Sequence, residues 1–250
     1  MKRSILFILF VAAAIACYLL FTRKNAAVEA VLPVETDSVA WKSAAGDSLS
    51  LRLDVPKSEN KKLNELITNV ICQMLQTEGA TLDAKALQKP MEQMIDTLHF
   101  DEETLPFYRE TKVEKTYETP ELVTFSSTDY IFTGGAHGIT LVDHRTILKN
   151  ACDTITWRDF KNTESAEFKA LLLEGLQKYF DVPTADAVNE MLIEPFNVPL
   201  TTPCLSQDGV IFTWQQYEIA PYALGIPQSV VSYEKIKPFL GDRLQKILTK

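Results

Sequence analysis

The most constraining feature of this sequence is a run of three long segments, rich in β-branched and aromatic residues, separated by short connections. The segments are Tyr108 to Glu118, Leu122 to Thr133 and Ile139 to Leu148. Such residues favour extended strands, and short connections join antiparallel neighbours. The sequence therefore predicts three antiparallel strands, with GGAHG, residues 134–138, as the loop between the last two.

The remaining elements follow from changes in the hydrophobic period. Ser48 to Val55 alternates as a half-buried strand and is expected to pair with Val39 to Lys42. Further strands are expected at Gly209 to Tyr217 and Ser229 to Tyr233. Five helices are expected: from Ser58 towards Gly79, from Leu87 to Leu98 with Pro90 near its first turn, one that follows a cap at Thr163, from Thr184 to Ile193, and from Glu234 to Leu248. Runs of strands separated by runs of helices predict an α+β fold, a mainly antiparallel sheet with helices packed against it.

The net charge of the chain indicates which classes of molecule it can bind. The 250-residue chain has a net charge of -8, and its first 24 residues contain four basic residues and no acidic ones. The remainder therefore carries 21 basic and 33 acidic residues, a net charge of -12. Such a body repels nucleic acid and anionic lipid surfaces, so we expect no nucleic-acid partner and favour a basic one.

The N-terminal segment is predicted to meet a membrane. Residues 4–21, SILFILFVAAAIACYLLF, are uncharged and mostly apolar and lie between two basic pairs. As a helix they would be about 27 Å long, enough to span a bilayer. Two interpretations are open: a transmembrane anchor, or a secretory signal in which Ala14 to Cys17 resembles a permissive lipobox and Cys17 is lipidated. Tyr18 to Phe21 keeps the chain apolar after that cysteine, which is unusual in a lipoprotein.

These observations give a domain plan. Residues 1–24 are the anchor or lipoprotein signal, 25–36 a linker, and 37–250 an extracytoplasmic α+β domain, which is open to division into lobes 37–120 and 121–250. Outside the signal segment the cysteines are Cys72, Cys152 and Cys204, without CxxC spacing, so zinc is not expected. Buried free thiols or one disulfide, Cys152 with Cys204, both fit an exported chain.

His137 in the GGAHG loop has a residue type that suits several kinds of chemistry. A phosphate cradle needs glycines between a strand and a helix, whereas here another strand follows. A metal site needs further ligands, but His144 is seven residues on and points to the opposite face of a strand, and no nucleophile motif lies nearby. We expect His137 to hydrogen-bond the backbone of its own turn, or to border a ligand surface, with Gly134 or Gly135 at positive φ.

The second segment of interest is Phe212 to Tyr233, rich in aromatic residues and proline. Aromatic side chains on a proline-stiffened loop suit contact with a partner, although core packing is the favoured explanation for Trp214 and Tyr217. Tyr222 is the better candidate for contact. We predict that the GGAHG hairpin and the loop from Ala220 to Gly225 border one ligand surface, formed by Gly134, Gly135, His137, Gly138, Tyr217, Pro221 and Tyr222.

The segment TGGAHG, together with YEIAPYALG and VVSYEKIKPFL further along, resembles the extracytoplasmic family called domain of unknown function 3298. That family occurs in RsiV-like anti-sigma factors and beside the catalytic domain of PdaC-type deacetylases. The resemblance spans about residues 37–249, of which the earlier part resembles the companion domain that precedes it. It implies an envelope domain on a membrane tether that binds a ligand, lysozyme in the RsiV-like case.

The sequence departs from both groups of relatives. Only three residues precede the apolar segment 4–21, so we expect no sigma-binding region, and no separate deacetylase domain is expected. We therefore expect a membrane-anchored ligand-binding protein of the bacterial envelope, outside the cytoplasm, without catalytic residues, metal or cofactor. Its expected partner is a protein or a cell-wall glycan. The alternative is a hydrolase or deacetylase acting on cell-wall carbohydrate, or an accessory domain to one.

Overall fold

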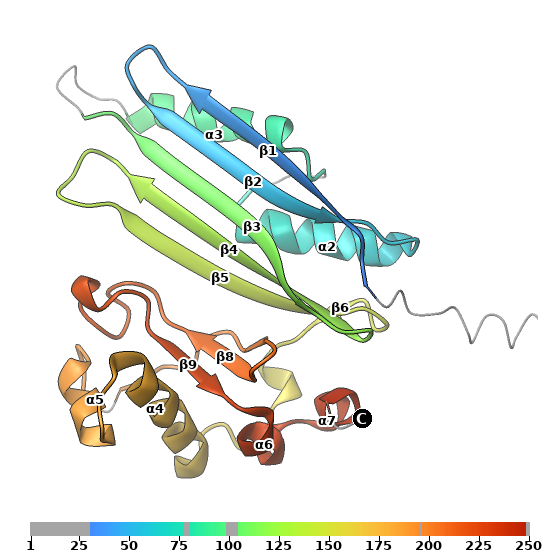
Figure 1. Ribbon diagram of the computed structural model, residues 1–250, viewed down its shortest axis with the longest axis vertical. Coiled ribbons are helices and arrows are strands. Elements are labelled where there is room, and N and C mark those ends of the chain that lie inside the picture. The colour runs from blue at the N-terminus through green and yellow to red at the C-terminus, as the bar shows by residue number, and fades with distance from the viewer. Residues whose placement is uncertain (1–30, 78–80, 99–104, 196, 249–250) are drawn as a thin grey trace, which may run out of the picture.

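A computed structural model of the chain describes residues 31–77, 81–98, 105–195 and 197–248. It contains a six-stranded sheet in the order β1-β2-β3-β4-β5-β6 and a three-stranded sheet in the order β7-β8-β9 (Figure 1). The strands are β1 (Val34–Lys42), β2 (Ser48–Pro56), β3 (Tyr108–Glu118), β4 (Leu122–Phe132), β5 (Ile139–Leu148), β6 (Asp153–Thr154), β7 (Cys204–Leu205), β8 (Val210–Thr213) and β9 (Gln228–Val231). The α-helices are α2 (Lys61–Met74), α3 (Ala84–Leu98), α4 (Ala166–Phe180), α5 (Ala185–Met191), α6 (Tyr233–Ile236) and α7 (Asp242–Leu248), and the 3₁₀ helices are η1 (Trp157–Asp159), η2 (Tyr222–Leu224) and η3 (Lys237–Phe239).

The predicted α+β class is confirmed, and so are the three central strands. Neighbours in the large sheet are antiparallel except β2 and β3, which are parallel. A parallel pair needs a crossover connection, and α2 and α3 supply it while covering one face of the large sheet (Figure 1). The small sheet and α4 lie on the side of β5 (Figure 1).

Two hydrophobic cores hold these layers together. The first packs α2 and α3 against the large sheet and includes Ile147, whereas the second joins α4 to the small sheet and includes Leu148. These two residues are consecutive in β5, and consecutive strand residues point to opposite faces of a sheet. Strand β5 therefore contributes to both cores.

Several expected boundaries were wrong for local reasons. Helix α2 is capped by Asn60, whose side chain accepts from the amides of Lys62 and Leu63, and not by Ser58. Helix α3 begins at Ala84, after Asp83 accepts the amide of Ala86, so Pro90 lies inside the helix. Helix α4 is capped by Ser165, not Thr163, while Thr184 caps α5 as expected.

The ends of the predicted domain also differ in detail. Strand β1 starts at Val34, within the expected linker, and Leu32 before it is only 1% exposed. The expected strand at 209–217 ends at Thr213, and the expected last helix is divided into α6, η3 and α7 at Pro238, which cannot continue a helical ladder. Cys72, Cys152 and Cys204 are free thiols, so the disulfide alternative is wrong.

The predicted membrane segment, residues 4–21, and Cys17 lie outside the described residues. Among the residues that are described, no helix is both long and apolar enough to cross a bilayer.

Candidate functional site

The GGAHG loop and the segment after β8 meet at one surface, as predicted. The ring of His137 stacks on that of Tyr222, with centroids 4.0 Å apart and planes at 24°. The Tyr222 hydroxyl donates to the carbonyl of Gly138 at 2.9 Å, and the Tyr217 hydroxyl lies 3.3 Å from His137 Nε2. We call His137, Gly138, Tyr217 and Tyr222 the loop junction.

Glycines shape the first of these loops. Gly134 has a φ of +90°, a conformation that L side chains rarely adopt. Gly138 is buried, and a Cβ placed there would lie 2.5 Å from the Tyr130 ring. Gly135 has neither constraint, since a Cβ would meet nothing within 4 Å. A positive φ was expected at Gly134 or Gly135, and the structure places it at Gly134.

Tyr217 is held in an unusual backbone conformation. Its φ is +67° and it is 53% exposed, so core packing is the wrong explanation for this residue. A non-glycine residue at positive φ is strained, and such strain is concentrated at functional sites. Core packing is right for Trp214, which is fully buried and donates from Nε1 to the carbonyl of Pro199 at 2.8 Å.

The second loop is braced from both sides. Exposed Pro221 precedes η2 with a φ of -56°, which its ring fixes, and so sets the start of that 3₁₀ helix. At the other end, the Tyr179 hydroxyl of α4 donates to the carbonyl of Leu224 at 2.9 Å. Tyr222 is thus presented to His137 from a fixed backbone.

The expected hydrogen bond between His137 and the backbone of its own turn is confirmed. Its Nδ1 lies 3.0 Å from the carbonyl oxygen of Gly138, so it bonds the backbone of its own turn. The ring is nevertheless exposed and stacked. Its hydrogen-bond partners in the described part of the chain are Gly138 and Tyr217, and neither is a carboxylate. Among the described residues, no group of three or more His, Cys, Asp or Glu side chains is arranged to hold a metal ion.

Two glutamines next to the junction were missed from the sequence. The side-chain amide of Gln215 accepts from the amide of Val142 at 3.0 Å and donates to its carbonyl at 2.7 Å. Gln216 accepts from the amide of Thr140 at 2.8 Å. These side chains pair with the outer edge of β5 as a neighbouring strand would, and they fasten the junction to the large sheet. Nothing in a QQ dipeptide signals this role.

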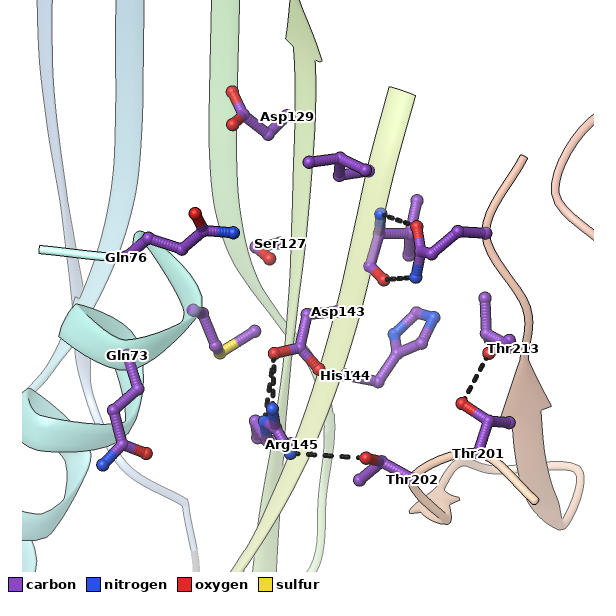
Figure 2. A pocket seen from close by; sticks show the side chains of 14 residues that line it. Gln73, Gln76, Ser127, Asp129, Asp143, His144, Arg145, Thr201, Thr202 and Thr213 are labelled. Carbon is purple, nitrogen blue, oxygen red and sulfur yellow. Dashed lines mark hydrogen bonds and ion pairs between the residues drawn. The ribbon is translucent and has the colours of Figure 1, made fainter. Parts of the chain in front are cut away.

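A polar pocket of about 390 Å³ lies beside the junction, at the same edge of β5 (Figure 2). It is bordered by the end of α2, by β4 and β5, and by the segment from Thr201 to Gln215. Its polar lining residues are Gln73, Gln76, Ser127, Asp129, Asp143, His144, Arg145, Thr201, Thr202, Thr213 and Gln215. From the sequence, His144 was considered as a metal ligand, and Ser127 and Asp129 were noted near His137 without a motif that would present a nucleophile.

Charges in and behind this pocket are paired. Asp129 accepts two hydrogen bonds from Arg109, from Nε at 2.9 Å and Nη2 at 2.7 Å, and a third from Thr111. Arg145 donates to Asp143 at 3.0 Å. Burial lowers the pKa of His144, partly opposed by the nearby carboxylate of Asp143, so the imidazole is neutral at pH 7.

Two family models match the chain. Residues 43–140 match a family described as Deacetylase PdaC, and residues 159–234 match the Protein of unknown function (DUF3298) family. The TGGAHG segment falls in the first match, although the sequence analysis assigned it to the second family. The loop junction therefore draws His137 and Gly138 from one matched region and Tyr217 and Tyr222 from the other.

Solved structures show the same fold. A DUF3298 family member from Bacteroides fragilis superposes with a TM-score of 0.69 at 19% identity, covering 89% of this chain and 100% of that one. A DUF3298 family protein from Pseudomonas aeruginosa gives a TM-score of 0.64 at 16% identity, covering 87% and 98%. No curated protein matches the chain. The chain thus contains a region that matches the Deacetylase PdaC family, followed by a region that matches the DUF3298 family, and it shares its fold with solved DUF3298 family proteins.

Proposed function

We propose that this protein is a membrane-anchored, extracytoplasmic binding protein of the bacterial envelope, and that its ligand docks on the loop junction. The observation that supports this proposal most is the stack of His137 on Tyr222 beside Tyr217. Tyr217 is exposed and has a positive φ. Aromatic rings on a fixed backbone bring a wide contact area at small cost in conformational entropy.

Two features support binding over a purely structural role. Burial of an apolar core explains why the strands form, but it does not require an aromatic cluster at the surface. An exposed tyrosine in a strained backbone conformation costs free energy, and such strain is found mainly where function requires it. The junction also spans both matched domains, so a ligand there would contact the two together.

The ligand class that we favour is a protein or cell-wall glycan, with a basic protein suited to the net charge of -12 outside the first 24 residues. The anchor would be residues 4–21, which fit a membrane-spanning helix or a lipoprotein signal. Cys17→Ala separates these two, because it abolishes lipid labelling of a lipoprotein and leaves a transmembrane protein in the membrane fraction.

Capture from envelope extract tests the binding role. The full chain, in mild detergent, is compared with His137→Ala and Tyr222→Ala, and with Glu164→Ala as the control. Glu164 is exposed, and it lies just before α4 begins at Ala166, whereas Tyr179 near the end of α4 contacts the junction loop. The 15 residues of α4 span about 22 Å, so the control is remote from the junction.

We expect wild type and Glu164→Ala to retain the same protein or glycan. In each junction variant the binding free energy of that ligand should weaken by about 1 to 2 kcal/mol. Retention that is equal in all four proteins would contradict the proposal. Turnover of cell-wall carbohydrate by the purified chain would instead support the hydrolase alternative.

A further inference from the structure

The polar pocket contains two buried polar atoms that lack a hydrogen-bond partner among the described residues. They are His144 Nε2 and Thr213 Oγ1. Thr213 is only 6% exposed, and both residues line the pocket. Figure 2 shows the His144 ring between β5 and the strand that carries Thr213. Buried polar atoms in native proteins are nearly always paired, so each of these calls for a partner that the described residues do not supply.

The charges of the pocket indicate what that partner is. Asp129 is paired with Arg109, Asp143 is paired with Arg145, and the imidazole of His144 is neutral at pH 7. No unpaired charge of these groups is available to a phosphate, a carboxylate or a cation. A neutral ligand is therefore favoured, since a buried charge is costly without a partner.

Chemical complementarity points to hydroxyl groups. A hydroxyl both donates and accepts, so it can satisfy the Thr213 hydroxyl and either tautomer of His144. The Thr201 hydroxyl, which donates to the carbonyl of Thr213, also lines the pocket on this side of β5. Ser127, Met74 and Leu141 line the pocket on the opposite face of the sheet. The volume of about 390 Å³ lies in the lower part of the range for small-molecule sites.

We propose that this pocket is a second binding site, distinct from the loop junction, for a small neutral polyhydroxylated molecule such as a single sugar unit. His144 Nε2 and Thr213 Oγ1 hydrogen-bond its hydroxyls. The site is independent of the proposed docking of a larger ligand at the junction, because it is lined by different side chains. The two sites are nevertheless neighbours, since Gln215 lines the pocket and Tyr217 belongs to the junction.

Calorimetric titration of the full chain tests this proposal. The probes are glucose, N-acetylglucosamine and myo-inositol, with inorganic phosphate as the charged control, in a detergent without a sugar head group. Thr213→Val keeps the side-chain shape and removes only the hydroxyl, and His144→Phe removes both ring nitrogens. Glu164→Ala, at an exposed position that lines neither site, is the control. Thermal unfolding of each variant, with and without probe, verifies that the protein is folded.

We expect at least one polyol to bind wild type and Glu164→Ala, and phosphate to bind neither. Affinity should fall at least about tenfold in Thr213→Val and in His144→Phe. Thr213→Val should unfold no more easily than wild type without probe, because it removes an unpaired atom.

Two results would overturn the proposal. One is the absence of polyol binding to wild type up to about 10 mM, which would leave ordered water as the partner of both atoms. The other is a polyol affinity that neither pocket substitution changes. If the proposal about the pocket is wrong, the proposal about the loop junction is unaffected, because ligand capture by the junction variants is measured separately.

Discussion

His137 and Tyr222 share one acceptor as well as a ring stack. The Nδ1 atom of His137 lies 3.0 Å from the carbonyl oxygen of Gly138, and the hydroxyl of Tyr222 donates to that same oxygen at 2.9 Å. His137 comes from the β4–β5 loop and Tyr222 from η2. The carbonyl of Gly138 therefore couples the two loops, and the junction forms only when both layers are in place.

Substitution of Tyr222 separates the hydrogen bond from the stack. Tyr222→Phe keeps the ring on His137 and loses the bond to Gly138, so we expect a loss of about 1 kcal/mol in the free energy of unfolding. Tyr222→Ala loses both and should destabilise further. Urea unfolding measures the two values. Equal stability of Tyr222→Phe and wild type would show that the shared acceptor is unimportant to the fold.

The strain at Tyr217 is testable with a matched pair of substitutions. Tyr217→Gly and Tyr217→Ala both remove the ring, but only glycine adopts a φ of +67° without a steric penalty. We expect the glycine variant to be more stable than the alanine variant by about 1 kcal/mol in urea unfolding. Both should bind the captured ligand more weakly than wild type. An alanine variant that is the more stable of the two would remove the argument from strain.

The central strands and the meeting of the two loops were predictable from the sequence, for a physical reason. Strands β3, β4 and β5 are long and rich in β-branched and aromatic residues, so local preference and tertiary structure agree. The hairpin loop then follows from its glycines. Tyr222 was identified as a contact residue because prolines restrict its loop.

Contacts that depend on tertiary placement could not be predicted. Gln215 pairs with Val142 only because the chain turns at Tyr217 beside the edge of β5, and that turn uses a backbone conformation unusual for tyrosine. The pocket is likewise assembled from α2, β4, β5 and the segment from Thr201 to Gln215, which are far apart in the sequence. Its unpaired atoms, on His144 and Thr213, carry no local signal.

Adjacent glycines in the hairpin loop provide a second matched pair. Gly134→Ala must place a Cβ at φ +90° and 3.2 Å from the Leu105 Cβ, so we expect a destabilisation of about 1 kcal/mol or more. Gly135→Ala has open space and no such conformation, and should melt close to wild type. Differential scanning calorimetry distinguishes them. The account of the loop fails if the two variants melt alike.

A buried ion cluster makes stability depend on pH. Glu118 has a side chain 7% exposed and pairs with Lys115 and with Lys149, which is 3% exposed, while accepting the amide of Leu32 at 2.7 Å. Burial alone would raise the pKa of Glu118, but the hydrogen bonds from the two lysines and Leu32 lower it overall. The carboxylate therefore stabilises the folded state above its unfolded pKa, about 4.3, and this contribution is lost as the pH falls through the lower folded pKa.

Substitution of Glu118 tests the cluster. Glu118→Gln should lower the free energy of unfolding by about 3 kcal/mol at pH 7, because it removes the carboxylate that pairs with Lys149. It should also make the free energy of unfolding depend less on pH in the acid range. The control is Glu114→Gln, which breaks an exposed pair with Arg52 and should cost less than about 1 kcal/mol. Urea unfolding at several pH values gives both results. Parallel pH profiles for wild type and Glu118→Gln would refute this assignment.

Photo-crosslinking in living cells tests the central claim most directly. The full chain, with p-benzoylphenylalanine in place of Tyr217 or His137, is compared with a chain that carries it in place of the exposed, remote Glu164. If the loop junction is the ligand surface, illumination should give the same protein or glycan adduct from positions 217 and 137 and none from position 164. No adduct from either junction position, or equal adducts from all three, would contradict the account.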